Sequence, residues 1–89
     1  MSASLVSVII PCYRQGHFLQ ECIDSLRKQS YPHWEAIIVN DGSPDNTREI
    51  SLGLHQLDAR VKYIEQKNAG LSAARNAGVA RSEEHTSEL

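Results

Sequence analysis

Short apolar runs alternate with longer helix-like segments along the chain, and this alternation constrains the fold more than any other feature. The runs are rich in β-branched residues, as buried strands of parallel sheets are, and they lie at residues 6–10, 34–39 and 61–64. The segments after them carry a helical apolar stripe or are rich in alanine, and they lie at residues 18–29, from 43 onward and at 71–80. A strand–helix order repeated three times with short connections predicts an α/β fold, β-α-β-α-β-α, whose parallel sheet has the order 3-2-1. Because crossovers in such units are right-handed, the first two helices should cover one face of the sheet.

Local signals set the expected ends of these elements. Pro11 is expected to end the first strand, and Tyr31-Pro32 the first helix, because proline disfavours helix at the residue before it. Ser43 is expected to cap the second helix, with Pro44 at its first position. The third helix should pack close to the sheet, on the face opposite the first two. No fourth strand is expected, so the first strand would form an uncovered edge, which is an aggregation liability.

Composition excludes several classes of function. With 89 residues the chain has room for one domain, and its net charge of −2 provides no basic surface for nucleic acid. No apolar run approaches the roughly 20 residues of a membrane span, and no secretory signal is recognised. Cys12 and Cys22 match neither a metal site nor a disulfide framework, so a cytoplasmic location is expected. The four histidines are scattered, and neither a P-loop nor a G-x-G-x-x-G motif occurs.

Three short loops, each after one of the predicted strands, are the candidate functional segments. They are Pro11-Cys12-Tyr13, Asp41-Gly42-Ser43 and Asn68-Ala69-Gly70, the last of which leads into a helix with Arg75. If the strands form one parallel sheet, all three loops lie at its carboxyl edge, where open α/β sheets bind ligands. A carboxylate, an aromatic ring and an arginine then converge, and these groups can hold a base, a ribose and a diphosphate.

Each of these side chains also has a purely structural interpretation. Asp41 could accept a hydrogen bond from a base N–H or a ribose hydroxyl, or it could only cap the turn at Gly42. Tyr13 could lie against a base or be a half-buried loop aromatic. Arg75 could pair with a diphosphate or be a solvated surface residue. Asp45 is expected at a helix N-terminus, where the helix dipole favours it, rather than on a ligand.

Together the motifs resemble those of the family 2 glycosyltransferases. They are V-S-V-I-I-P-C-Y, Q-S-Y-P-H-W-E-A-I-I-V-N-D-G-S-P-D-N-T and N-A-G-L-S-A-A-R-N-A-G, and the resemblance covers residues 5–80. It implies a partial GT-A, Rossmann-like fold. It also implies transfer of a sugar from a nucleotide-diphosphate sugar, commonly a UDP-sugar, to a polysaccharide or lipid-linked glycan, with inversion at the anomeric carbon. Family members often carry membrane segments farther along, so the full-length parent can be membrane-associated.

The resemblance also implies roles for individual residues. The implied nucleotide-sugar-binding residues are Pro11, Tyr13, Asp41, Asn68, Gly70 and Arg75. The first two match the loop that contacts the base, the aspartate matches the one that hydrogen-bonds uracil or ribose, and the arginine matches a basic residue near the diphosphate. The asparagine and glycine belong to the same nucleotide-binding motif. Arg14 departs from the pattern, because the family usually has asparagine there.

The family's metal and acceptor segments are absent from this sequence. In the full-length enzyme a D-x-D motif after the third helix holds a divalent ion, Mg or Mn, and no D-x-D occurs here. Residues 81–89 instead resemble a translated sequencing adapter, so we expect a non-native or disordered tail without ligands at Glu83, Glu84 or His85. Residues 1–80 are thus expected to be the nucleotide-sugar-binding part of a truncated domain, with no catalytic residue and no activity alone.

Two other functions remain open. One is a small stand-alone nucleotide-binding module, which predicts a monomer that melts cooperatively. The other is half of a dinucleotide-dependent oxidoreductase, with Asp41 on a ribose, which predicts tighter binding of NAD than of UDP. The missing glycine fingerprint argues against the oxidoreductase.

Overall fold

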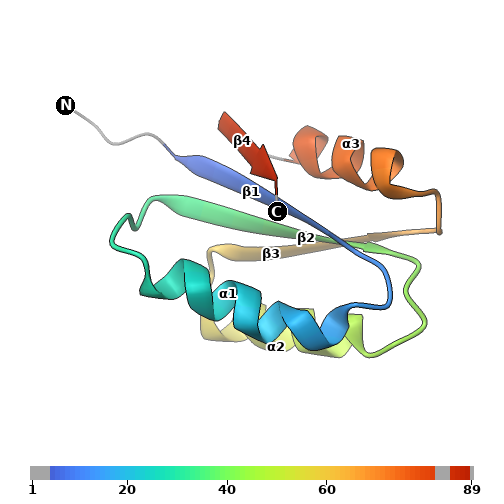
Figure 1. Ribbon diagram of the computed structural model, residues 1–89, viewed down its shortest axis with the longest axis horizontal. Coiled ribbons are helices and arrows are strands. Elements are labelled where there is room, and N and C mark those ends of the chain that lie inside the picture. Colours follow the sequence, from blue (N-terminus) through green and yellow to red (C-terminus); the bar gives the residue numbers. More distant parts are fainter. Residues whose placement is uncertain (1–4, 82–84, 89) are drawn as a thin grey trace.

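The computed structural model describes residues 5–81 and 85–88, which form a sheet with helices on both faces (Figure 1). The strands are β1 (Val6–Cys12), β2 (Trp34–Asp41), β3 (Val61–Gln66) and β4 (His85–Glu88). The helices are α1 (Leu19–Lys28), α2 (Thr47–Leu57) and α3 (Leu71–Arg81), with a short 3-10 turn before α1 at Gly16–Phe18. The predicted alternation of strands and helices is confirmed.

The four strands are parallel and lie in the order β3-β2-β1-β4. The predicted order 3-2-1 is therefore confirmed for the first three strands. β2 lies between β1 and β3, and all 8 of its residues are buried. This is expected of a parallel strand that is covered on both faces, and it explains the nearly continuous apolar run in its sequence.

The expectation that the chain has no fourth strand was wrong. Residues 85–88 pair with β1, from Val6 opposite His85 to Ile9 opposite Glu88. The reason is that the free edge of β1 presents unpaired N–H and C=O groups, which an extended segment can join whatever its side chains are. Because such pairing depends on the backbone, it does not test where the sequence of residues 81–89 comes from, and their adapter origin stays a prediction. Residues 82–84 and 89 of this tail lie outside the described residues.

Helices α1 and α2 cover one face of the sheet and α3 covers the other, as predicted (Figure 1). Successive residues of a strand point to opposite faces, so each strand contributes to both cores. The core beneath α1 and α2 is the larger, and its buried residues are Val8, Ile10, Cys12, Leu19, Ile23, Trp34, Ala36, Ile38, Leu54 and Val61. The buried residues of the core beneath α3 are Ile9, Ile37, Val39 and Ala74.

Gly78 brings α3 close to the sheet. A Cβ atom at this position would overlap Cγ2 of Ile9 and lie 3.3 Å from Cγ2 of Val39. Ala74, one turn earlier, is fully buried. The prediction that small side chains let this helix approach the sheet is thus confirmed, and a larger residue at position 78 would force the helix outward.

Two predicted element ends were wrong. β1 continues beyond Pro11, because a strand tolerates proline where no neighbour requires its N–H, and the pairing of β1 with β4 already ends at Ile9. α2 begins at Thr47 rather than at Ser43. The side chain of Asp45, and not that of Ser43, accepts the Thr47 N–H at 3.1 Å, so the tertiary arrangement of the loop delays the helix.

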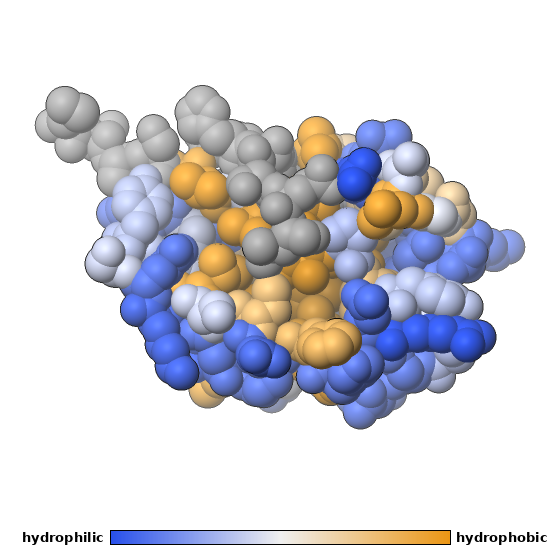
Figure 2. All heavy atoms as spheres, viewed as in Figure 1, coloured by the Kyte–Doolittle hydropathy of each residue, from blue (hydrophilic) through white to orange (hydrophobic). Residues whose placement is uncertain are grey.

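The surface between β1 and α1 remains partly apolar. Figure 2 shows apolar residues in the middle of this face, with hydrophilic residues below and to the right. A hollow of about 180 Å³ lies there, lined by Ile10, Pro11, Cys12, Gln15, Phe18, Leu19 and Cys22. Within the described residues, no helix has both the length and the apolar character needed to cross a membrane.

Candidate functional site

The three candidate segments lie at the carboxyl ends of β1, β2 and β3, along one edge of the sheet, as the sequence predicted (Figure 1). Pro11 and Cys12 are still within β1, and Asp41 is the last residue of β2. The connection after each strand contains one residue in the left-handed region of backbone conformation, namely Arg14 (φ 59°), Gly42 (φ 70°) and Gly70 (φ 94°). Among the described residues, only these three have a positive φ. A left-handed residue lets the chain turn sharply out of a strand, so three such turns shape this edge.

Asp41 joins the loop after β2 to the loop after β3. The residue is only 4% exposed. Its Oδ1 accepts hydrogen bonds from Gln66 Nε2 at 2.8 Å and from the Ala69 N–H at 2.9 Å, and its Oδ2 accepts the Gly70 N–H at 3.1 Å. These donors, the Gln66 amide first, lower the pKa of the Asp41 carboxyl below its ordinary value. The ionised carboxylate therefore holds the two loops together.

Asn68 and Gly42 complete this junction. The Asn68 amide donates to the backbone carbonyl of Asp41 at 3.0 Å and lies 3.5 Å from the Oδ2 atom. Gly42 packs directly against the same residue, since a Cβ on Gly42 would come within 2.7 Å of the Asn68 backbone nitrogen. Both the positive φ and this close approach require glycine at position 42.

Asp45 joins the loops after β1 and β2 in a similar way. Its carboxylate accepts the Gly16 N–H at 3.0 Å, the Thr47 N–H at 3.1 Å and the hydroxyls of Ser43 and Thr47. Ser43 Oγ in turn accepts the N–H of Arg14 at 2.8 Å. These bonds, that of the Ser43 hydroxyl first, hold the pKa of Asp45 far below its usual range. Asp45 thus lies at the N-terminus of α2, as predicted, and it also fixes the loop after β1.

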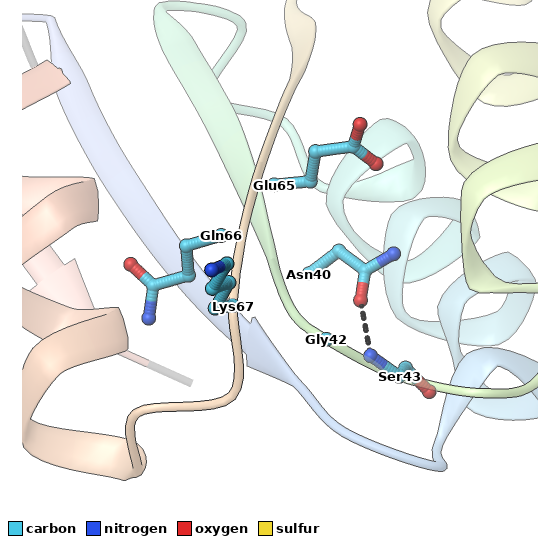
Figure 3. Close-up of a pocket in the computed structure, with 6 residues that line it drawn as sticks. All are labelled: Asn40, Gly42, Ser43, Glu65, Gln66 and Lys67. Atoms are coloured by element: carbon cyan, nitrogen blue, oxygen red, sulfur yellow. Dashed lines mark hydrogen bonds between the residues drawn. The ribbon is translucent and has the colours of Figure 1, made fainter.

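A polar hollow of about 500 Å³ opens between the loops after β2 and β3 (Figure 3). Its lining residues are Asn40, Gly42, Ser43, Glu65, Gln66 and Lys67. Asn40 Oδ1 accepts the Ser43 N–H at 2.8 Å, drawn dashed in Figure 3, and its Nδ2 donates to the Tyr63 hydroxyl at 2.9 Å. The hollow therefore offers amide, carboxylate and ammonium groups to a polar ligand, beside the loop junction at Asp41.

The described residues do not fit a divalent metal ion. Within residues 5–81 and 85–88, no group of three or more histidine, cysteine, aspartate or glutamate side chains is placed to hold one. The oxygens of Asp41 and Asp45 are engaged by N–H and O–H donors instead. No chemistry of this site is therefore assigned to a bound ion.

Residues 7–84 match the sequence profile of a family described as Glycosyl transferase family 2. The chain belongs to this family. EpsJ of Bacillus subtilis (strain 168), an uncharacterized glycosyltransferase, is 49% identical over 75 residues, which are 84% of this chain and 22% of EpsJ. The resemblance stated from the motifs is confirmed.

Solved glycosyltransferases share the fold of this family 2 chain. TarS of S. aureus, residues 1–349 in complex with UDP-GlcNAc, matches it with a TM-score of 0.85 and 27% identity over 96% of this chain and 26% of that one. The mannosyltransferase PcManGT of Pyrobaculum calidifontis, in complex with GDP-Man and Mn2+, matches with a TM-score of 0.83 and 22% identity over 93% and 26% of the two chains. The partial GT-A fold is thus confirmed. The chain spans about a quarter of these proteins.

Three of the six family 2 residues predicted to bind the donor form the junction just described. Asp41, Asn68 and Gly70 are in hydrogen-bond contact, although they come from two loops far apart in the sequence. The alternative interpretation, that Asp41 only caps the turn at Gly42, does not match these hydrogen bonds, because its donors lie at the end of β3 and in the loop after it. Its own turn is closed by Asn40, which accepts the Ser43 N–H.

The other three residues belong to other elements at the same end of the sheet. Pro11 is in β1, opposite Val39 of the neighbouring strand. Tyr13 follows in the loop and is 41% exposed, with the Arg14 guanidinium 5.4 Å from its ring centre. Arg75 is exposed on the first turns of α3. Ligand binding by all six residues stays a prediction.

Sequence reasoning missed two residues that organise the site. Asp45 was assigned only a helix-terminal position, yet it also binds the loop after β1. Its place in the Asp-Gly-Ser-Pro-Asp segment is a turn signal that could have suggested this. Gln66 was not singled out at all, and no local signal marks it, because its contact with Asp41 depends on the register of β3 against β2.

Proposed function

We propose that this chain binds the nucleotide of the sugar donor in an inverting glycosyltransferase. The full-length enzyme would transfer a sugar from a nucleotide-diphosphate sugar, a UDP-sugar in the first instance, to a polysaccharide or lipid-linked glycan. The junction at Asp41 carries this proposal, because it sets an ionised acceptor between two loops at the edge where such sheets bind ligands. Family membership and the likeness to TarS, solved with UDP-GlcNAc, support the same class of donor.

Each predicted residue has a group suited to one part of a nucleotide. An ionised aspartate only accepts hydrogen bonds, so Asp41 would take an N–H of the base or a hydroxyl of the ribose. The exposed ring of Tyr13, beside Pro11, offers a flat face on which a base can stack. Arg75 can pair with the diphosphate through two parallel N–H groups. Asn68 and Gly70 would hold the loop that shapes this cleft.

The chain alone is proposed to be inactive. The support is the lack of a metal-binding group among the described residues and the share of the relatives' length that the chain spans. In the full-length enzyme, Mg or Mn would neutralise the leaving diphosphate. We also propose a cytoplasmic location, in which the full-length parent can be membrane-associated. Incubation of the purified chain with a panel of labelled UDP-sugars and glycan acceptors should yield no product, and any transfer would refute inactivity.

Titration with UDP tests the donor site directly. We expect two-dimensional ¹H–¹⁵N NMR spectra of the chain to show shifts that saturate with UDP and concentrate at the loops after β1, β2 and β3. Asp41→Ala should lose most of this response, while Glu49→Ala, which removes an exposed carboxylate on α2, should keep it. Equal responses from Asp41→Ala and the unmodified chain would remove Asp41 from the site, and tighter binding of NAD would revive the oxidoreductase alternative.

A further inference from the structure

Oδ1 of Asp41 is fully occupied by two donors. A carboxylate oxygen can accept about two hydrogen bonds, and Oδ1 already accepts Gln66 Nε2 and the Ala69 N–H. Oδ2 accepts the Gly70 N–H and has the Asn68 amide 3.5 Å away. The residue is also 4% exposed. A base N–H can therefore bind Oδ1 only if one of its two donors leaves.

Gln66 is the donor that can leave without a change of the backbone. Two of the others are main-chain N–H groups, of Ala69 and Gly70, so their removal would require the whole loop after β3 to move. The Asn68 amide is already held at 3.0 Å by the backbone carbonyl of Asp41. Gln66 binds only through its side chain, which is half-buried at the last residue of β3.

Gln66 also lies between Asp41 and solvent. Its side chain is half-buried, and in Figure 3 it points toward the α3 side of β3, away from Asn40, Ser43 and Glu65. Its amide is bound to Asp41 on that side, at the end of the strand. A partly exposed side chain at the end of a strand can change rotamer without a change of the backbone.

We propose that Gln66 occupies the position on Asp41 that the nucleotide base takes, so that binding exchanges the glutamine amide for a ring N–H of the base. Gln66 is thus a positioning residue that keeps the buried carboxylate satisfied in the empty site and lowers the affinity for the nucleotide. The inference rests on the proposed function and adds a requirement to it. The base must present an N–H donor, as uracil does at N3. When the Gln66 amide leaves, Oδ1 of Asp41 is an acceptor that lacks one of its donors.

The test compares UDP binding to Gln66→Met and to the unmodified chain by NMR titration. Methionine keeps the length of the side chain but has no donor, so the exchange no longer breaks a hydrogen bond. We expect UDP to bind about ten-fold more tightly, the lower end of the size expected for one hydrogen bond to a charged group. N3-methyl-UDP, which lacks the ring donor, should gain nothing. Gln66→Ala should give the same direction, and Gln56→Met, on the exposed face of α2, should leave the affinity unchanged.

A spectroscopic signal distinguishes exchange from a general loosening of the site. In the unmodified chain, the side-chain NH₂ resonances of Gln66 should move towards those of a free amide as UDP saturates the site. If Gln66→Met binds UDP more weakly than the unmodified chain or equally well, the exchange is overturned. If Asp41→Ala still fails to bind UDP in the same experiments, the proposed function stands. No UDP binding by the chain or by either Gln66 variant would overturn both.

Discussion

The two ends of the sheet satisfy their carboxylates by different means. At the amino end, where β2 and β3 begin, each carboxylate faces a cation. Glu35 Oε1 lies 2.9 Å from Lys62 Nζ, and Asp58 lies 2.7 Å from the Arg60 guanidinium and 3.4 Å from that of Arg27. At the carboxyl end, Asp41 and Asp45 accept hydrogen bonds from N–H and O–H donors. No ion pair to either carboxylate is seen in residues 5–81 and 85–88.

This difference shows how one sheet can serve both stability and binding. An ion pair cancels charge, whereas neutral donors lower the pKa of a carboxylate and leave its charge in place. The carboxyl end therefore keeps the negative charges of Asp41 and Asp45, which attract a base N–H but repel a diphosphate. A cation must then be supplied there. Arg75 is the predicted one, and Lys67 also lines the hollow at this end. All described left-handed residues also lie at this end, and Arg14, the one among them that is not glycine, carries backbone strain there.

Removal of a buried charge at the amino end should have the largest effect. Glu35 is 2% exposed and binds Lys62 and the Ser7 hydroxyl. Glu35→Ala leaves the lysine partly buried without this partner, and we expect the free energy of unfolding in urea to fall by about 3 kcal/mol. Glu65→Ala is the exposed control, because its 4.0 Å pair with Arg48 and its hydrogen bond from the Tyr63 hydroxyl are both exposed, and the ion pair should contribute roughly 0.5 kcal/mol or less. Similar losses from both would mean that burial of the Glu35 pair adds nothing to its effect.

The pH dependence of Asp58 should be intermediate in size. Its pKa is lowered to about 2, first by the hydrogen bond from the Arg60 side chain. Because the unfolded value is near 3.9, Asp58 stabilises the folded chain above about pH 4, and this contribution disappears as the pH falls towards 2. We expect Asp58→Asn to lower the free energy of unfolding by about 2 kcal/mol at pH 7 and by almost nothing at pH 2.

Urea unfolding at several pH values between 7 and 2 measures this difference. Asp24→Asn is a suitable control, because Asp24 binds only the neutral amide of Gln20 in its own helix. A loss for Asp58→Asn that is the same at every pH would show that packing, rather than the charge pair, holds the amino end.

Relief of strain at the carboxyl end should have the smallest effect, with the opposite sign. Arg14 has φ 59°, and a residue other than glycine or asparagine is disfavoured there. Arg14→Asn, which restores the residue usual in family 2, should raise the free energy of unfolding by about 0.5 kcal/mol. Thermal unfolding can detect the change, with Gln15→Asn, at φ −126°, as the control. A destabilised Arg14→Asn would contradict a strained edge and point to a role for the guanidinium beside Tyr13.

Local patterns predicted the elements well and their ends less well. The β-branched runs and helical stripes identified all three α/β units, because burial imposes a period on the sequence. The start of α2 was missed because serine is a common N-cap and proline often follows it at the first helical position. In the structure the Ser43 hydroxyl instead donates to Asp45 and accepts the N–H of Arg14. The fourth strand was missed because edge pairing through the backbone leaves no signature in side chains such as those of residues 85–88.

The sequence by itself determined that the chain forms parallel α/β units with three loops at one edge, since periodicity and turn residues are properties of neighbouring positions. Its motifs also determined the family. Only the tertiary structure decided what Asp41 binds, because its donors lie 25 to 29 positions away and meet it through the register of β3 against β2. The same holds for Asp45 with Gly16, 29 positions apart. Hydrogen bonds between loops depend on distances in space, and no local pattern encodes them.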